Sequence, residues 1–425
     1  MSGEERSGDP NRHSSASVLK RAQPTRLGVG VSGGGDSMAL LDMMIVYGLE
    51  HGLPVEAVTV DHGLRPEAAD EAESVSRFCA ARGVPHSTLQ WNRAVESGNL
   101  QAEAREARYR MIADWARARG IDCVALGHTM DDQAETFLMR LARKSGVDGL
   151  AAMDAQFERN GIRWIRPLLG RSRAELREYL VNRSIAWIED PSNENRQFER
   201  IRARDALSAL SGLGIDAEAL SDVSHQLAAA RQALNYYAVQ EATRIVAEDH
   251  GDILLTGFRQ PSVPDEIERR LLVSALQWVG GLTYPPRRSA LAELEIALCG
   301  EARTHTLCGC ILSLSVSSGE HDAGLRISRE YNAVKSIHCP TDQMWDGRWK
   351  LDGPHAADLE IRALGDAVKD CPEWRETGRP RTSLLSSPAV WRGDQLIAAP
   401  VAGFLNGWTA SATGRGSFTQ FLLSR

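Results

Sequence analysis

The amino-acid sequence predicts an α/β protein whose first domain contains a doubly wound parallel sheet. Between about residues 26 and 141, short apolar runs alternate with longer amphipathic segments, which is typical of parallel strands joined by helices. Beyond about residue 206, long helical periodicity gives way to short strands separated by turns. A chain of 425 residues also exceeds the size at which one core usually divides, about 250–300 residues.

The elements of the first domain follow from this alternation. We expect strands at four apolar runs: LGVGV (27–31), VEAVTVD (55–61), VPHSTLQW (84–91) and DCVALGH (122–128). Helices are expected over residues 36–50, 66–82, 100–119 and 131–141, the third with Asn99 as its N-cap. Further along, Ser172 precedes a helical pattern with Glu175 in the capping-box position. This arginine-rich stretch is expected to close the first domain.

The pattern divides the whole chain into four parts. Residues 1–24 are polar and are expected to form a disordered tail, and residues 25–205 form the α/β domain. Residues 206–300 are expected to form a helical domain, broken near Pro261 and Pro264, and residues 301–425 a small β-rich module.

Composition excludes several classes of protein. No apolar run is long enough for a membrane-spanning helix, and the first residues contain no apolar signal-peptide core. Seven cysteines without a secretory signal indicate reduced thiols and a cytoplasmic protein. Cys299, Cys308 and Cys310 lack the paired spacing of a zinc site, so we expect them to pack in a core. The net charge of −7 leaves nucleic-acid binding open, because local basic surface binds phosphates.

A phosphate-binding loop follows the first strand. The strand LGVGV leads into SGGGDS and then into an apolar helix, so three glycines let backbone amides at a helix N-terminus approach an anion. A carboxylate in such a loop would repel phosphate unless a divalent cation lay between them, so Asp36 implies Mg2+. The alternative is a glycine-rich turn in which Asp36 only complements the helix dipole. We expect phosphate contacts from Ser32, Gly33, Gly34, Gly35, Asp36 and Ser37.

Two other nucleotide motifs can be set aside. Gly28, Gly30 and Gly33 match a dinucleotide fingerprint formally, and Asp61 ends the next strand as a ribose-binding acid would. That fingerprint needs its first glycine after the strand, whereas Gly28 and Gly30 lie within the apolar run. No Gly-Lys-Ser/Thr follows, so the loop is not a Walker A motif.

The motif and five further blocks resemble one family. SGGGDS after a strand resembles the PP-loop, the pyrophosphate-binding motif of enzymes that adenylate a carbonyl-type oxygen. VDHGLR (60–65), GNLQAEAREARY (98–109), GHTMDDQAETFLMRLARKSGVDGLAAM (127–153), RPLLGRSRAELREYL (166–180) and WIEDPSNEN (187–195) resemble successive blocks of tRNA(Ile)-lysidine synthetases. The resemblance is dense over residues 26–205 and implies an adenine nucleotide alpha hydrolase-like fold there.

The resemblance also implies an activity. ATP, with Mg2+, would adenylate O2 of the wobble cytidine in a minor isoleucine tRNA with a CAU anticodon, releasing pyrophosphate. Free L-lysine would then attack C2 and expel AMP, which makes the protein a ligase forming a C–N bond. The β-rich module would contact tRNA. A homodimer is compatible with the sequence, which does not fix the oligomeric state.

Two carboxylates are candidates for recognising lysine. Asp132 and Glu135 lie three residues apart on one helical face, beside the carboxyl end of a strand. The family resemblance assigns them to lysine, with one of them near the ε-amine. From the residues alone, acids complementing the helix dipole are the better explanation.

Other candidates flank these carboxylates. The resemblance makes Arg108 a candidate for stabilising charge during adenylation, although a lone arginine is usually a surface residue. His128 either contacts nucleotide or makes a structural hydrogen bond, and Asp61 and His62 lie near the expected adenine pocket. Four arginines are candidates for tRNA backbone contacts: Arg196, Arg200, Arg202 and Arg204. Only five of the 49 basic residues are lysine, so an exposed, non-binding arginine surface remains an equal alternative.

Two competing functions differ in the residues that they require. A PP-loop tRNA thiolase would need cysteines to carry sulfur, yet Cys79 and Cys123 form no C-x-x-C pair. A nucleotide or tRNA-binding module without catalysis would keep the glycine-rich loop but lack Asp36, Asp132 and Glu135, all of which are present. The sequence therefore favours the ligase.

Overall fold

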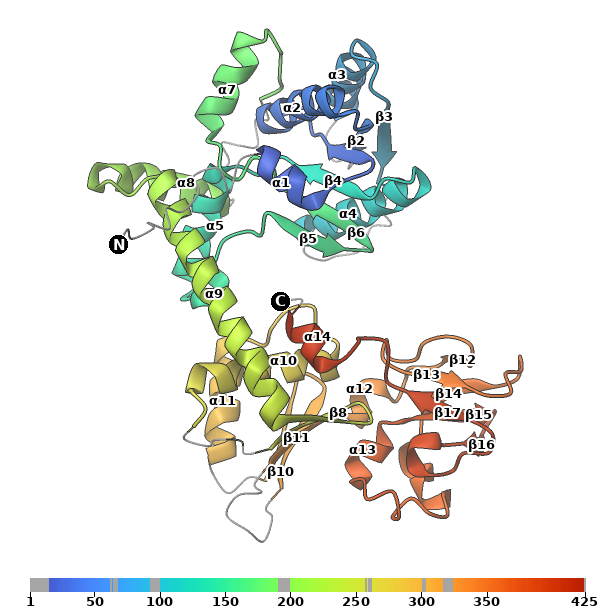
Figure 1. Ribbon diagram of the computed structural model, residues 1–425. Coiled ribbons are helices and arrows are strands. Elements are labelled where there is room, and N and C mark those ends of the chain that lie inside the picture. The colour runs from blue at the N-terminus through green and yellow to red at the C-terminus, as the bar shows by residue number, and fades with distance from the viewer. Residues whose placement is uncertain are drawn as a thin grey trace, which may run out of the picture. The chain divides into compact units, whose positions relative to one another are not determined.

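The computed structural model describes residues 15–61, 63, 68–91, 100–189, 199–256, 258, 262–299, 303–315 and 324–423 (Figure 1). The chain folds into two compact units, Met1–Arg231 and Gln232–Arg425. Within the described residues, no helix is both long and apolar enough to cross a membrane. Three expected positions, His62, Asn99 and Arg196, lie outside the described residues.

The first unit is built on a six-stranded sheet with the order β3-β2-β1-β4-β6-β5. All neighbouring strands are parallel except β5 and β6, which form an antiparallel hairpin. The strands are β1 (Leu27–Gly30), β2 (Val55–Asp61), β3 (His86–Gln90), β4 (Cys123–Leu126), β5 (Gln156–Arg159) and β6 (Ile162–Ile165). The four expected strands and the doubly wound parallel sheet are thus confirmed, and the β5–β6 hairpin is an addition.

Helices cover both faces of this sheet (Figure 1). Alternate residues of one strand face opposite layers: Cys123 and Ala125 of β4 pack with α2, whereas Val124 and Leu126 pack with α4. The helices of this unit are α1 (Ser15–Ala22), α2 (Gly35–His51), α3 (Ala68–Ala80), α4 (Leu100–Ala118), α5 (Met130–Ala142), α6 (Val147–Leu150), α7 (Arg173–Asn182), α8 (Glu199–Leu210) and the first part of α9 (Ala217–Ile245).

The glycines in β1 are needed for packing. A Cβ atom on Gly28 would lie 2.9 Å from the Trp115 ring, and one on Gly30 would lie 3.2 Å from Leu126. Gly28 therefore lets α4 approach the sheet closely, and Gly30 leaves room for the Leu126 side chain of the neighbouring strand β4. This packing accounts for the formal dinucleotide fingerprint without a dinucleotide.

The structure corrects the expected disordered tail. Helix α1 lies within residues 1–24, and its residues Val18, Leu19 and Ala22 are buried in the core of the first unit. The segment is polar on average, which favours a disordered tail, but its few apolar residues share one helical face.

The second unit contains two cores. In the first, β7 (Val246–Asp249), β8 (Asp252–Thr256), β11 (Gly324–Arg329), β10 (Cys310–Ser315) and β9 (Thr304–Leu307) form an antiparallel sheet in the order β7-β8-β11-β10-β9. Helices α10 (Asp265–Gly280) and α11 (Arg288–Cys299), the end of α9, and α14 (Phe418–Leu423) pack with it. Cys310 is fully buried there, as expected, whereas Cys308 lies in the turn between β9 and β10 and is only partly buried.

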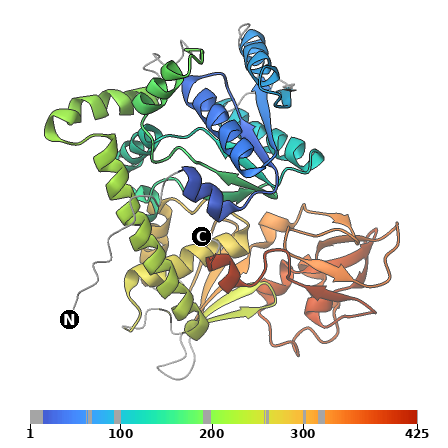
Figure 2. The same cartoon turned by 45° about the horizontal axis from the view of Figure 1, so that its top comes forward.

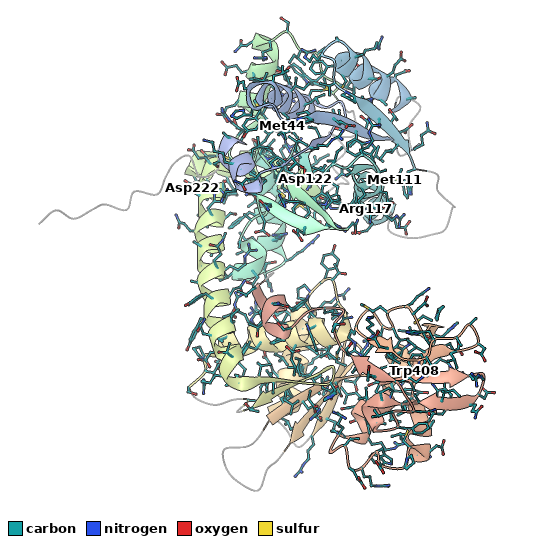
Figure 3. All side chains as sticks on the ribbon, turned by 45° about the vertical axis from the view of Figure 1, so that its right-hand side comes forward. Met44, Met111, Arg117, Asp122, Asp222 and Trp408 are labelled. Carbon is teal, nitrogen blue, oxygen red and sulfur yellow. The ribbon has the colours of Figure 1, made fainter. Side chains whose placement is uncertain are left out.

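The second core belongs to a module of short strands. Strands β12 (Cys339–Pro340), β14 (Glu360–Ala363), β15 (Pro388–Arg392) and β16 (Gln395–Ala398) form one sheet, and β13 (Lys350–Asp352) pairs with β17 (Thr409–Ser411). Trp408 lies buried within this module (Figure 3). Shorter helices complete it: α12 (Tyr331–Val334), η3 (Gly365–Asp370), α13 (Arg381–Leu385) and η4 (Pro400–Ala402).

The units do not divide where we expected boundaries at residues 205 and 300. Residue 205 lies inside α8, and the division at 231/232 falls inside α9, one continuous helix (Figure 2). Residue 300 separates β7 and β8 from the strands with which they form a sheet. Residues 206–300, which we expected to be helical, therefore include the β7–β8 hairpin. Its turn contains His250 and Gly251, which both have positive φ.

One buried carboxylate joins α2 to α7. Asp42 is 2% exposed, and its Oδ2 accepts from the Tyr179 hydroxyl at 2.8 Å and lies 2.7 Å from Arg183 Nε. Arg82 Nε lies 3.3 Å from the other oxygen.

We predict that Asp42→Ala lowers the free energy of unfolding of the protein by about 2–4 kcal/mol, because two guanidiniums and a phenol lose one buried partner. Thermal and urea unfolding would measure the loss. Asp114→Ala is the control, since Asp114 pairs with Arg117 on the surface and should change stability by less than about 0.5 kcal/mol. Equal stabilities of the two variants would contradict the prediction.

Candidate functional site

The segment SGGGDS forms a turn between β1 and α2 that its own serines hold in shape. The Ser37 hydroxyl donates to the Gly34 carbonyl at 2.8 Å and accepts from the Ser32 backbone N–H at 3.1 Å. Gly33 has a φ of +86°, which favours glycine. The hydroxyl hydrogen of Ser37 is therefore used inside the loop, whereas Ser32 is exposed.

The same turn places the first residues of α2 against the end of β4. A Cβ atom on Gly127 would lie 3.2 Å from the Asp36 carbonyl oxygen, so glycine permits this close approach. On the other side, a Cβ on Gly35 would lie 3.5 Å from the Trp187 ring. The N-terminus of α2, where amides lack partners within the helix, thus lies beside the segment that leads into α5.

Helix α5 begins with a capping box that fixes Asp132. The Thr129 hydroxyl accepts from the Asp132 backbone N–H, and Oδ2 of Asp132 accepts from the Thr129 backbone N–H at 2.9 Å. One oxygen of Asp132 therefore caps the N-terminus of α5. This agrees with the explanation that the residues alone favoured, in which the acid interacts with the helix terminus. Its other oxygen, Oδ1, faces a different partner.

That partner is Arg173, the first residue of α7. Its guanidinium lies 2.7 Å from Asp132 Oδ1, 2.6 Å from Glu135 Oε1 and 3.3 Å from Asp36 Oδ2. Its backbone N–H donates to Asp131 Oδ2 at 2.8 Å. We call Asp36, Asp131, Asp132 and Glu135 the acid cluster. Arg173 thus connects the phosphate-binding loop to both carboxylates that we expected to recognise lysine.

Two arginines of α8 also face the acid cluster. Arg204 Nε donates to Glu135 Oε1 at 3.0 Å, and Arg200 Nη1 lies 4.0 Å from Asp132 Oδ1. Arg200 and Arg204 therefore lie on one face of α8, and this face is directed at carboxylates. Arg202, by contrast, is exposed.

Burial and neighbouring charge act differently on the carboxylates. Burial disfavours ionised Asp132, but the Arg173 charge and the Thr129 amide outweigh it and hold the pKa of Asp132 below its usual value. Burial raises the pKa of Asp36, and Arg173 only partly offsets this. An additional cation beside Asp36 would therefore be favourable.

A second group of candidates lies next to the acid cluster. Burial, followed by the charge of Arg166, lowers the pKa of His128 to about 3, so its imidazole is neutral at physiological pH. Burial also lowers the pKa of Arg108, which feels the charges of Arg105 and Arg200. His128 is thus an electrostatic neighbour of Asp132 in the acid cluster, whereas Arg108 lies near Arg200, which faces that cluster.

Asp61 is not brought into this group by any described contact. Its Oδ1 accepts from the Gly63 N–H at 2.8 Å, which holds the turn after β2. Among the described residues, no group of three or more histidine, cysteine or acidic side chains could hold a metal ion by itself. A metal ion here would need ligands from the nucleotide.

Comparison with known proteins identifies the family. A family model described as a PP-loop domain matches residues 10–211. Over 405 residues the chain is 48% identical to the tRNA(Ile)-lysidine synthase of Ruegeria pomeroyi, with 94% of each chain covered. The chain belongs to the tRNA(Ile)-lysidine synthase family. Those of Brucella anthropi and Wolbachia pipientis are each 34% identical, over 87% and 88% of this chain and 84% and 88% of theirs.

Arg173 was not among the site residues predicted from the sequence of this lysidine synthase family member. The capping residues Ser172 and Glu175 were expected and are confirmed by the structure, but the residue that directly follows Ser172 was not singled out. A signal was present, because a cation in the first turn of a helix opposes the helix dipole and so needs another reason to be there.

We predict that Arg173→Met lowers the free energy of unfolding by about 3–5 kcal/mol, since Asp132 and Glu135 would stay buried without their main cation. Urea unfolding would measure the loss. The control is Arg177→Met on the same helix, because Arg177 is 62% exposed and lies 3.6 Å from exposed Glu189.

A double-mutant cycle on Arg173 and Glu135 separates the effect of their charge interaction on stability from the effect of lost packing. Glu135→Gln should be less destabilising in the Arg173→Met protein than in the native one, by roughly 1 kcal/mol or more. Strictly additive losses in urea unfolding would show that the guanidinium does not hold the carboxylate.

Proposed function

We propose that the protein is an ATP-dependent ligase that joins free L-lysine to C2 of the wobble cytidine of isoleucine tRNA with a CAU anticodon. One structural observation supports this proposal in addition to family membership. Asp132 and Glu135 are buried and meet Asp36 of the phosphate-binding loop at a single guanidinium. An anion site for nucleotide and a carboxylate pair for an amino-acid cation are therefore adjacent.

In the first step, cytidine O2 attacks the α-phosphorus of ATP, and the bond from that phosphorus to the departing pyrophosphate breaks. The α2 N-terminus and the glycines of SGGGDS would bind the pyrophosphate oxygens. Arg108 is proposed to stabilise charge developing on the α-phosphate, which suits a guanidinium.

Mg2+ fits Asp36 as a single protein ligand. Magnesium commonly binds one or two carboxylates together with substrate phosphates, and Asp36 lies in the phosphate loop with its side chain 29% exposed. When bound, the ion would neutralise charge on the departing pyrophosphate. Burial raises the pKa of Asp36, so a cation at this position would also stabilise the ionised carboxylate.

In the second step, an amine nitrogen of lysine attacks C2, the C2–O2 bond breaks, and AMP leaves with the oxygen. The amine must lose a proton before it attacks. Glu135 is proposed to bind this end of lysine, because its Oε2 has only a 3.5 Å contact with Arg173. His128, with a pKa of about 3, is a poor proton acceptor.

Lysine can reach Glu135 only if an arginine moves. The Glu135 side chain is 1% exposed and is covered by Arg173 and Arg204, which are 22% and 43% exposed. Within the described residues, Arg204 pairs with one carboxylate, whereas Arg173 pairs with three. We therefore propose that Arg204 is displaced when the ammonium group binds.

The cysteines argue against the thiolase alternative. Burial raises the pKa of Cys79 to about 11 and that of Cys123 to about 12. Neither thiol would be ionised at neutral pH, as a sulfur carrier requires.

Recognition of the tRNA is proposed to use surfaces outside the loop, because the loop is proposed to bind the pyrophosphate group of ATP, which is the same whichever tRNA is bound. Arg202 is exposed and remains a candidate for a backbone contact. The module of short strands between α12 and β17 is a second candidate. ATP and tRNA meet in the cytoplasm, which is the compartment that we propose.

We predict that incubation with ATP, Mg2+, lysine and isoleucine tRNA yields a cytidine whose mass corresponds to lysidine, measured by mass spectrometry of the digested tRNA. Asp36→Ala should abolish the product while leaving the melting temperature nearly unchanged, because the Asp36 side chain in the first turn of α2 is partly exposed and its desolvation disfavours the ionised form. Methionine tRNA is the substrate control. Near-normal product from Asp36→Ala would contradict the assignment of the loop.

We predict that Glu135→Gln raises the KM for lysine by about 10-fold or more, because a charged hydrogen bond contributes roughly 1.5–3 kcal/mol. The affinity for ATP should change little, and isothermal titration would measure it. Glu175→Gln, an acid of the α7 capping box, is the control. A collapse of ATP binding in Glu135→Gln would reassign this carboxylate to the metal or the nucleotide.

A further inference from the structure

The chain returns to the phosphate-binding loop after α7. Ser184 follows this helix with a positive φ of +53°, which turns the chain back. The Ile185 backbone N–H donates to the Leu180 carbonyl at 2.9 Å, and the Ile185 side chain is buried in the same core as α2. The residues that come next, Trp187 and Ile188, therefore reach the loop between β1 and α2.

Ile188 is joined to the loop through its backbone. Its N–H donates to the Gly33 carbonyl at 3.0 Å, and Ile188 forms an isolated parallel β-bridge with Gly34. Its side chain also limits which residue the loop can contain, because a Cβ atom on Gly33 would lie 3.1 Å from Ile188 Cδ1. Position 33 thus favours glycine for two reasons, its φ of +86° and this contact.

Trp187 covers another glycine of the loop. A Cβ atom on Gly35 would lie within 3.7 Å of three atoms of the indole ring, the closest at 3.5 Å. Gly35 is the first residue of α2, where backbone N–H groups have no partner within the helix. The indole is partly buried and packs against the core that contains α2. The ring therefore restricts movement of the helix terminus that is proposed to bind the pyrophosphate oxygens.

The loop needs such support because glycine is the most flexible residue. Three consecutive glycines lose more conformational entropy on ordering than other residues would, and a loop that becomes ordered only when its ligand binds weakens the affinity. The hydrogen bonds of Ser37 act inside the loop, on the Ser32 N–H and the Gly34 carbonyl. The Gly33 carbonyl and the exposed side of the Gly35 backbone are held instead by residues 187 and 188.

We propose that Trp187 and Ile188 are positioning residues, which hold the phosphate-binding loop in the conformation that binds the pyrophosphate part of ATP. Both act through the backbone of the glycines and not by touching the nucleotide. This inference rests on the proposed function in one respect, that the loop binds pyrophosphate. Loss of either side chain should therefore weaken ligands that contain a pyrophosphate group and spare a ligand that lacks one.

The test compares ligands with and without a pyrophosphate group. Isothermal titration in the presence of Mg2+ measures the affinities of ATP, inorganic pyrophosphate and AMP for the folded protein. Trp187→Ala removes the ring beside Gly35, and Ile188→Ala removes the contact with Gly33, so two variants probe the same loop independently. Trp187→Phe is the conservative variant, because another flat ring can cover Gly35.

Ile185→Val is the matched control for lost stability. Ile185 lies in the same segment and is 4% exposed, but its side chain packs in the core and its N–H bonds to Leu180 rather than to the loop. Thermal unfolding of every variant identifies a temperature at which all of them are folded. Ile185→Val should lower the melting temperature without changing any of the three affinities.

We expect Trp187→Ala and Ile188→Ala to lower the affinities for ATP and pyrophosphate by between about 10-fold and about 100-fold, as small displacements of a positioned group can. The affinity for AMP should not change. Trp187→Phe should restore the native affinity for ATP.

Native ATP affinity in both folded alanine variants would overturn the proposal, and so would a Trp187→Phe protein that binds ATP as weakly as Trp187→Ala. An equal loss for AMP, or a loss of ATP affinity in Ile185→Val, would also overturn it, because either result would show a general loosening of the domain. None of these measurements uses tRNA or lysine. A native protein that forms no lysidine would therefore refute the proposed function and leave this inference standing.

Discussion

The candidate site depends on the need to neutralise carboxylates that are buried together. Asp36, Asp132 and Glu135 come from two helices, and without a shared cation their mutual repulsion and desolvation would oppose the fold. Arg173 supplies that cation from a third helix, α7. The geometry of α2, α5 and α7 around the end of the sheet is therefore set by a charge balance, and the same balance prepares the site for cationic ligands.

Sequence periodicity predicted the parts of the site that local rules determine. The SGGGDS loop follows a strand and opens a helix, and Asp132 and Glu135 share a helical face, as expected. Arg173 could not be found in this way, because its partners lie 38 to 137 residues away in the sequence. The β7–β8 hairpin was missed because DILLT is too short to separate from a buried helical segment by periodicity.

The abundance of arginine has two different structural outcomes. Arg200 and Arg204 formed part of the expected tRNA-binding group, yet both face carboxylates of the acid cluster. Arg108, which the resemblance made a catalytic candidate, has no acidic partner among the described residues, and neither have Arg105 and Arg166, which were not singled out in the sequence. Counting basic residues cannot separate these cases, since the distinction depends on which acids the fold brings near. Pairing is a tertiary property.

The packing of α14 has a consequence for the order in which the protein can fold during its synthesis. Phe418 and Leu422 are buried in the same core as Ala238 and Ile253, and the Phe418 backbone N–H donates to Glu248 Oε1 at 2.6 Å, across 170 residues. Within the described residues, the cores of the first unit are built from residues before 231, so this unit can fold while translation continues. The first core of the second unit is instead completed only after residues 418–422 leave the ribosome, and until then the apolar surface of α10 around Trp278 that Phe418 covers is available to chaperones.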